Sequence, residues 1–224
     1  MADINIIKAM KERHSVRQYT DKPLGEDVAR SLEEEIAACN EESGLRIQFV
    51  KNEPKAFQGF LAHYGSFRGV TSYLALVGKK NASLDETCGY YGERLVLKAQ
   101  QLGLNTCWAA LTYSKVASAF TVNVGEKLCA VIAIGYGKTQ GVPHKSKSIE
   151  KVSKTDGPAL DWFTSGVEAA LLAPTAINQQ KFYFTLNGTK VSTKAGVGFY
   201  TKIDLGIVKY HFELGAGTEN FSWN

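Results

Sequence analysis

The sequence predicts a mixed α+β protein in which helices alternate with about five strands. Apolar residues recur at helical spacing in several segments, and short β-branched and aromatic runs lie between them. Glycine or proline ends most of these segments. The 224 residues, of which 44% are hydrophobic and 21% charged, suffice for one sizeable core or for two small cores that share a surface.

Five segments carry an apolar stripe at the spacing of a helix. The expected helices are one from Ile4 to near Lys11–Arg13, one over Asp27–Cys39, one from Ser83 to Gly103, one from Pro158 to Pro174 and one from Asp204 to Gly215. Ser83-Leu84-Asp85-Glu86 has the form of a capping box. Asp204 is placed to cap the last helix, and Gly103 and Gly215 are placed to end helices.

Short runs rich in branched and aromatic residues predict the strands. The clearest are Arg46–Val50, Thr71–Val77, Leu128–Ile134 and Phe182–Leu186. Leu128–Ile134 is apolar at every position, which predicts a central strand covered on both faces. The polar, basic stretch 138–157 is the best candidate for a linker, so we expect a first half over 1–137 and a second half over 158–224 that together form one compact unit.

Composition narrows the class of function. The formal net charge of +4 is mild, and basic residues are concentrated only around Lys138–Lys154, which favours small anionic ligands over nucleic acid. The N-terminus lacks the pattern of a signal peptide, and runs such as Cys129–Ile134 are far shorter than a membrane span, so we expect a cytoplasmic protein without membrane contact. The four cysteines, at positions 39, 88, 107 and 129, are not closely paired in the sequence as in a zinc site or a redox motif. We interpret all four as reduced core residues.

Several common catalytic motifs fail on spacing. Gly135-Tyr136-Gly137 follows a strand, but a basic loop stands where a dinucleotide fingerprint needs a helix. Gly137-Lys138-Thr139 imitates the end of a phosphate-binding loop, yet Ile132 occupies the position of its first glycine. The four histidines are scattered, no metal site is expected, and no serine lies in a nucleophile elbow. Such a chain either only binds a ligand or takes its chemistry from a cofactor.

The stretch Arg13-His14-Ser15-Val16-Arg17-Gln18-Tyr19 is the most informative in the sequence. In an extended chain Arg13, Ser15 and Arg17 project to the same side, at steps of about 6.6 Å. Two guanidiniums that flank a hydroxyl suit a phosphate and a polar ring edge. A solvated basic loop explains the spacing equally well.

This stretch resembles the opening signature of the nitroreductase family of FMN enzymes, in which an Arg-x-Ser-x-Arg/Lys run followed by an aromatic residue binds FMN. The segment from Gly92 to Trp108 is similar to the central helix of that family and its Gly-Leu-Gly-Thr-Cys-Trp ending. Asn105 replaces a glycine there, and asparagine tolerates a left-handed backbone. Val131–Gly137 looks like the strand and glycine turn that follow, so the resemblance spans nearly the whole chain.

One family motif is displaced. The usual Ala-Pro-Ser-x-x-Asn-x-Gln sequence is missing near Asn40, whereas Ala173–Phe182 matches it well. A proline helix stop followed by a polar turn would also account for that segment. With this arrangement the chain resembles the branch called "putative TM nitroreductase", in which the second half repeats the helix, motif and strand of the first.

The resemblance implies an α/β sandwich with a central, mainly antiparallel sheet, flanking helices and a partial internal repeat. It implies FMN as cofactor, with NADH or NADPH as hydride donor and a small-molecule electrophile, such as a nitroaromatic or a quinone, as acceptor. No side chain is expected to be catalytic, because FMN carries the chemistry. The residues that it implies for cofactor binding are Arg13, His14, Ser15, Arg17, Trp108, Ala109, Ala110, Leu111, Pro174, Thr175, Asn178 and Gln180.

Alternatives remain open at this stage. One is an FMN-binding carrier or sensor, or a specialised flavin enzyme without nitroreductase activity. Another is an interaction module without flavin. A homodimer is possible, and the flavin site could lie within one chain, which we favour, or across a dimer interface.

Overall fold

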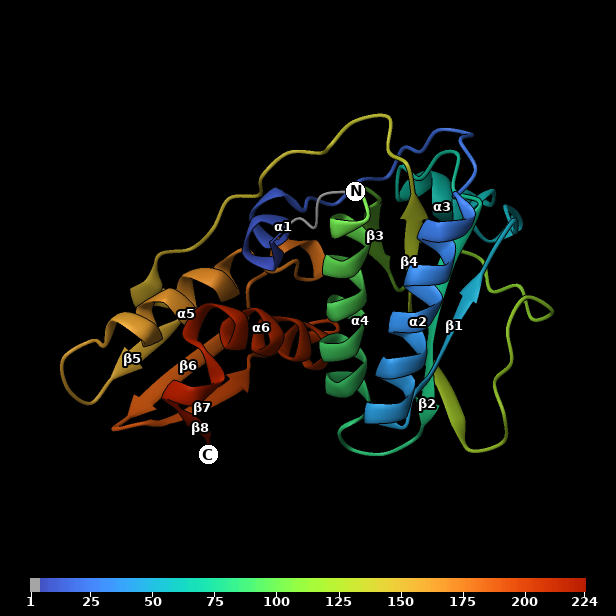
Figure 1. Ribbon diagram of the computed structural model, residues 1–224. Coiled ribbons are helices and arrows are strands. Elements are labelled where there is room, and N and C mark those ends of the chain that lie inside the picture. The colour runs from blue at the N-terminus through green and yellow to red at the C-terminus, as the bar shows by residue number, and fades with distance from the viewer. Residues whose placement is uncertain (1–4) are drawn as a thin grey trace. The chain divides into compact units, whose positions relative to one another are not determined.

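The computed structural model describes residues 5–224, which divide into two compact units (Figure 1). The first unit comprises the residues up to Leu84 together with Arg94–Pro143, and the second comprises Asp85–Glu93 together with His144–Asn224. Both units combine helices with a sheet. The predicted α+β class is therefore confirmed, although the strands form two separate sheets of four.

The first unit contains an antiparallel sheet in the order β1-β2-β4-β3. Its strands are β1 (Arg46–Val50), β2 (Ser72–Lys79), β3 (Asn105–Ala109) and β4 (Glu126–Gly135). β4 contains the apolar run 128–134 and lies between β2 and β3, so the prediction of a central strand is confirmed.

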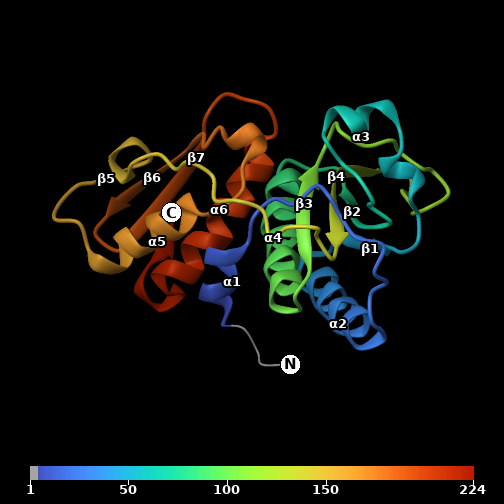
Figure 2. The ribbon, with the colours of Figure 1, turned by 90° about the horizontal axis from the view of Figure 1, so that it is seen from above.

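The helices of the first unit are α1 (Ile6–Glu12), α2 (Glu26–Ser43) and α3 (Phe60–Tyr64), together with residues 94–101 of α4 (Leu84–Gln101). α3 and the segment that follows β3 lie on the face of the sheet opposite to α2 (Figure 2). Beneath α3, Tyr73 and Ala75 of β2 share a core cluster with Phe57 and Phe67. The rings of Phe57 and Phe67 are 4.9 Å apart, as in an ordinary aromatic pair.

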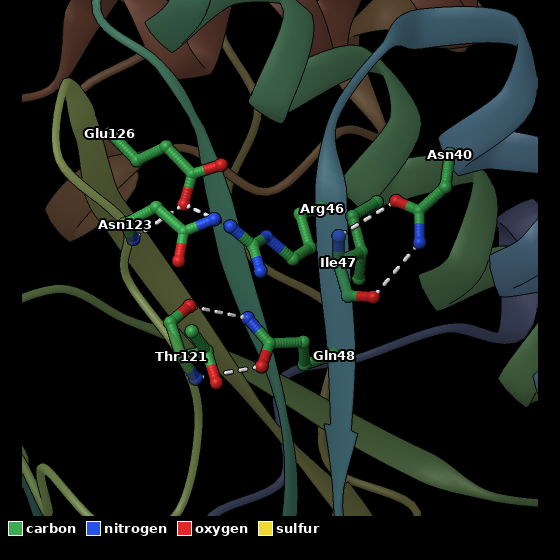
Figure 3. A network of polar contacts seen from close by, with 7 residues as sticks. All are labelled: Asn40, Arg46, Ile47, Gln48, Thr121, Asn123 and Glu126. Carbon is green, nitrogen blue, oxygen red and sulfur yellow. Dashed lines mark hydrogen bonds and ion pairs between the residues drawn. The ribbon is translucent and has the colours of Figure 1, made fainter.

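Strand β1 lies at the edge of this sheet, and a side chain covers part of its outer backbone (Figure 3). Asn40 of α2 accepts a hydrogen bond from the Ile47 amide at 2.7 Å and donates one to the Ile47 carbonyl at 3.0 Å. Arg46 pairs with Glu126 at 2.6 Å on the same sheet. Asn40 thus serves as a substitute for a neighbouring strand, because an edge strand otherwise presents unpaired backbone groups.

We expect Asn40→Ala to lower the free energy of unfolding by about 1 to 2 kcal/mol, because two backbone groups of Ile47 lose their partner. Chemical denaturation followed by circular dichroism measures the change. Glu41→Ala is the control, since Glu41 is exposed on the same helix. Equal stabilities of the two variants would contradict a stabilising role for Asn40.

The second unit contains a mixed sheet in the order β5-β6-β7-β8. Its elements are β5 (Ser153–Thr155), α5 (Asp161–Leu171), β6 (Phe182–Asn187), β7 (Lys190–Ala195), α6 (Thr201–Ala216) and β8 (Ser222–Trp223). β6 and β7 form an antiparallel hairpin. At the two edges of the sheet, β5 pairs in parallel with β6, and β8 pairs in parallel with β7. Phe184 of β6 stacks on Phe212 of α6 with ring centres 4.6 Å apart, which fixes the helix on the sheet.

Glycines allow α6 to approach its neighbours closely. A Cβ atom on Gly206 would lie 1.9 Å from the Glu86 carbonyl oxygen of α4, and one on Gly89 would lie 2.0 Å from the Ile203 carbonyl oxygen. Real Cβ atoms do not approach that closely, so only glycine fits at either position. Gly215 plays the same part against α5, where a Cβ would meet that of Ala169 at 2.4 Å.

Several local predictions are wrong. Gly215 does not end α6, which continues to Ala216 and is capped by Gly217 with φ of 74°. The helix expected from Pro158 begins at Asp161. β5 lies inside the expected linker, because residues 153–155 pair with β6. Ser83 does not cap α4 with its side chain, since its hydroxyl donates to the Asn81 side chain instead.

The prediction for the cysteines is confirmed, since all four are unpaired and buried. The first helix ends where expected, at Glu12. Ile4, the first residue of its expected stripe, lies outside the described residues.

Candidate functional site

The segment Arg13–Tyr19 runs along strand β3 of the first unit. Ser15 forms a parallel bridge with Thr106, and the Val16 amide donates to the Thr106 carbonyl at 3.0 Å. On its other side, the Arg68 amide donates to the Arg17 carbonyl, and the Tyr19 amide donates to the Arg68 carbonyl, both at 2.9 Å. The segment is therefore fixed between β3 and the loop that follows α3.

The predicted Arg-x-Ser-x-Arg motif lies near the Cys107 thiol of β3. Burial raises the pKa of Cys107, while the charge of Arg17, a hydrogen bond with Ser15 and the charge of Arg13 act to lower it. Three groups can influence one sulfur atom only if all three lie near it. The structure thus brings Arg13, Ser15 and Arg17 together, with Arg13 buried at 4% exposure and Arg17 exposed.

A glycine turn after β4 borders the same motif. The Gly137 amide donates to the Asn105 side chain at 2.9 Å, and the Asn105 amide group donates to Gln140 at 3.0 Å. A Cβ on Gly141, whose φ is 73°, would lie 2.7 Å from that of His14. This close approach packs the turn against the motif.

The role expected for Asn105 is wrong. Asn105 lies in β3, and the residue that adopts the left-handed backbone is Gly103, with φ of 77°. The side chain of Asn105 instead stabilises the turn at Gly137 by accepting a hydrogen bond from the Gly137 amide.

Of the predicted residues 108–111, Trp108 and Ala109 are the last two of β3, and Ala110 and Leu111 follow the strand. Trp108 is half-buried, and Ala109 is buried opposite Val131. Leu111 is 66% exposed, so it is available to a ligand. After Leu111 the chain runs close to the end of α3. A Cβ on Gly65, the residue that follows α3, would lie 2.6 Å from the Cβ of Thr112.

The remaining predicted residues lie in the second unit, in the loop 173–181 between α5 and β6. This loop has an unusual backbone, because three of its residues have positive φ and none of them is glycine. They are Ile177 at 48°, Asn178 at 55° and Gln180 at 46°. Such conformations cost on the order of 1 to 3 kcal/mol each and persist only where neighbouring groups hold them. Ile177 is the most unusual, since β-branched residues rarely adopt this region.

The side-chain amides of Asn178 and Gln180 form hydrogen bonds within the second unit. Gln180 is buried, accepts from the Lys147 amide at 2.8 Å, and donates to the Lys145 carbonyl and the Asn178 side chain at 2.8 and 2.7 Å. Asn178 donates to the same Lys145 carbonyl at 2.9 Å. Both residues therefore fix the shape of the loop. Thr175 takes part as well, because its hydroxyl accepts from the Gln180 amide at 3.0 Å and its carbonyl accepts from the Asn178 amide at 2.9 Å.

Asp204 is a member of this loop network that the sequence did not reveal. Its two carboxylate oxygens accept from the Ala176 amide at 2.9 Å and from the Gln179 side chain at 2.7 Å. Burial raises the pKa of Asp204 to about 6, and those two hydrogen bonds act to lower it. The prediction that Asp204 caps the last helix is wrong, because α6 begins at Thr201 and the carboxylate points to another segment. In the sequence, Asp204 looks like an ordinary residue at a helix start, and nothing near it indicates the contacts with Ala176 and Gln179.

Two further properties concern the described part of the chain. None of the helices within residues 5–224 is long and apolar enough to cross a membrane. In the same residues, no group of three or more histidine, cysteine, aspartate or glutamate side chains could hold a metal ion.

Comparison with known families gives one match over nearly the whole chain. A family model described as "Putative TM nitroreductase" matches residues 5–216. No curated protein matches the chain.

Solved structures agree on the fold. A crystal structure described as a putative nitroreductase from Thermotoga maritima is 22% identical, covers 96% of this chain and 85% of that one, and has a TM-score of 0.64. A putative nitroreductase from Desulfovibrio desulfuricans in complex with FMN is 20% identical, covers 70% of this chain and 100% of that one, and has a TM-score of 0.54. A putative NADH dehydrogenase/NAD(P)H nitroreductase from Bacteroides thetaiotaomicron is 17% identical, covers 66% and 95%, and has a TM-score of 0.52.

Proposed function

Because the chain belongs to the family described as "Putative TM nitroreductase", we propose that it is an oxidoreductase that depends on FMN. In this proposal a hydride passes from NADH or NADPH, through the flavin, to a nitroaromatic, quinone or similar electrophile. The relative from Desulfovibrio desulfuricans was solved in complex with FMN, and the one from Bacteroides thetaiotaomicron is described as a putative NADH dehydrogenase/NAD(P)H nitroreductase. Both descriptions support the proposal.

The observation that carries it is the placement of the segment with Arg13, Ser15 and Arg17 along β3, with all three residues near Cys107. Two guanidiniums and a hydroxyl offer several hydrogen-bond donors and two positive charges, a donor set that fits a flavin phosphate and the polar edge of its ring system. The same set would not suit an apolar ligand, because the buried cationic group of Arg13 needs an anionic or polar partner.

The chain's own residues bind and orient the cofactor in this mechanism. Arg13 and Arg17 hold it by charge, Ser15 donates or accepts one hydrogen bond, and Asn105 holds the glycine turn beside them. Pro174 and Thr175, in the loop 173–181 of the second unit, are proposed as further cofactor contacts. When bound, FMN supplies the hydride chemistry, so the protein needs no acid, base or nucleophile of its own.

We expect Arg17→Ala to weaken FMN binding about tenfold to a hundredfold, because a hydrogen bond to a charged group contributes about 1.5 to 3 kcal/mol. Arg17 is exposed, so its loss should leave the folded structure intact. Titration of flavin-free protein with FMN, followed by flavin fluorescence, measures the change.

The matched control is Arg30→Ala, which removes the same charge from an exposed position on α2. Its FMN affinity should equal that of the wild type. If Arg17→Ala binds FMN as tightly as Arg30→Ala does, the assignment of Arg17 fails.

Turnover should follow ping-pong kinetics, with donor and acceptor bound alternately at one site. The motivation is that the sequence offers no acid, base or nucleophile constellation that could join two substrates bound together. Initial rates of NADH or NADPH oxidation at several concentrations of a quinone should give parallel double-reciprocal lines. Intersecting lines would mean that both substrates are bound at once, and retained yellow colour without NADH or NADPH oxidation would indicate a carrier.

A further inference from the structure

The loop 173–181 contains more backbone strain than a connection between a helix and a strand requires. Ile177, Asn178 and Gln180 all have positive φ, and Ile177 is 90% exposed. An exposed, β-branched residue gains nothing in packing from this conformation. Residues held in this way cluster at ligand sites, where surrounding groups over-determine the backbone.

The groups that hold the loop come from two sides. On one side, Lys147 donates its amide to the Gln180 side chain, and its ammonium group donates to the Gln179 and Gln180 carbonyls at 2.9 and 2.8 Å. On the other side, Asp204 of α6 accepts from the Ala176 amide and from Gln179. Asp204 is only 3% exposed, so its carboxylate is withdrawn from water to make these two contacts.

The chemistry of these contacts requires a carboxylate. Both partners of Asp204 are donors, and the Gln179 amide group also donates to the Phe199 carbonyl at 2.8 Å. An asparagine at 204 would place its own donor against one of these donors. Turning the Gln179 amide to relieve the clash would place its oxygen against the Phe199 carbonyl. Only a group with two acceptor atoms satisfies all the donors at once.

We propose that Asp204 is a positioning residue that holds the strained loop 173–181 in the shape in which it contacts the flavin; this inference rests on the proposed function. Asp204 itself does not touch the cofactor. It acts through the Ala176 amide and the Gln179 side chain, which flank the left-handed residues at 177 and 178.

The test compares Asp204→Asn with Glu86→Gln. Both variants lose one carboxylate of the second unit at nearly constant shape, but Glu86 lies on α4, where it pairs with Lys209 and has no contact with the loop among the hydrogen bonds described above. The first readout is amide hydrogen exchange of residues 175–180 in protein without added flavin. We expect exchange about tenfold faster in Asp204→Asn and unchanged in Glu86→Gln, because lost anchoring raises the population of open loop.

The second readout is FMN itself, measured as affinity and as the visible circular dichroism of the flavin at saturation. We expect affinity about tenfold weaker and an altered dichroism band in Asp204→Asn, and neither change in Glu86→Gln. Gln179→Met removes one of the two contacts and should give a smaller change of the same sign, which keeps the test decisive if Asp204→Asn does not fold.

Each outcome decides one statement. Unchanged loop exchange in Asp204→Asn would overturn the positioning role. Faster exchange with unchanged FMN affinity and dichroism would overturn the link between the loop and the flavin. Failure of the wild type to bind FMN would contradict the proposed function, whereas the exchange measurement would still test whether Asp204 holds the loop.

Discussion

Gly206→Ala should remove at least about 3 kcal/mol from the stability of the second unit, because the added methyl group has no space. Its Cβ would lie 1.9 Å from the Glu86 carbonyl oxygen and 2.6 Å from the Tyr90 amide nitrogen, both backbone atoms of α4. Overpacking usually costs about 1 to 3 kcal/mol where side chains can move aside. Two backbones cannot do so without separating the helices. The gain of up to about 1 kcal/mol in helix propensity on replacing glycine offsets only part of this cost.

Urea unfolding followed by tryptophan fluorescence measures the effect, since Trp162 and Trp223 both lie in the second unit. The control is Gly157→Ala, at a position in the same unit where an added Cβ meets nothing within 4 Å. Wild-type stability of Gly206→Ala would show that α4 and α6 are not packed as closely as described.

His211→Leu should lower the free energy of unfolding by about 3 to 5 kcal/mol, the usual cost of removing one partner from a buried ionisable pair. His211 and Glu93 are both fully buried, and the histidine Nε2 lies 2.9 Å from a Glu93 carboxylate oxygen. Nδ1 lies 3.1 Å from the Ala169 carbonyl, which can only accept, so Nδ1 bears a proton. A leucine leaves the Glu93 carboxyl group in the core without this hydrogen bond.

A double variant separates the pair from simple loss of packing. His211→Leu combined with Glu93→Met replaces both polar partners with apolar groups of similar size, a change that is often neutral or stabilising. We therefore expect the double variant to be more stable than His211→Leu alone. Additive losses in denaturant unfolding would contradict an energetic coupling between the two residues.

The sequence predicted those features that depend on local pattern. The apolar run at 128–134 predicted a central strand, and β4 is one. The stripe Val28, Leu32 and Ile36 predicted α2, since helical periodicity is visible without knowledge of the partner that buries it. The same-side spacing of Arg13, Ser15 and Arg17 holds only on the condition of an extended chain, and the bridge between Ser15 and Thr106 meets that condition.

Features that depend on contacts distant in sequence could not be predicted in this way. Asp204 has the position of a helix cap, yet its carboxylate accepts from Ala176, 28 residues earlier. Gly215 has the position of a helix end, but it lies inside α6, where the absence of a Cβ lets α5 pass close to it. In both cases a tertiary contact overrides a local preference, and a single sequence records only the preference.

In the proposed function the chain binds FMN through its phosphate, with Arg13 and Arg17 as the charged partners. The most direct measurement is a paired titration of flavin-free protein with FMN and with riboflavin, which lacks only the phosphate, followed by flavin fluorescence and absorption. We expect saturable binding of FMN at least about tenfold tighter than that of riboflavin, since a charge-assisted phosphate contact contributes more than about 1.4 kcal/mol. We also expect Arg13→Ala and Arg17→Ala, combined in one chain, to remove this preference. Equal affinities for the two flavins in the wild type, or no saturable binding of either, would contradict binding of FMN through its phosphate.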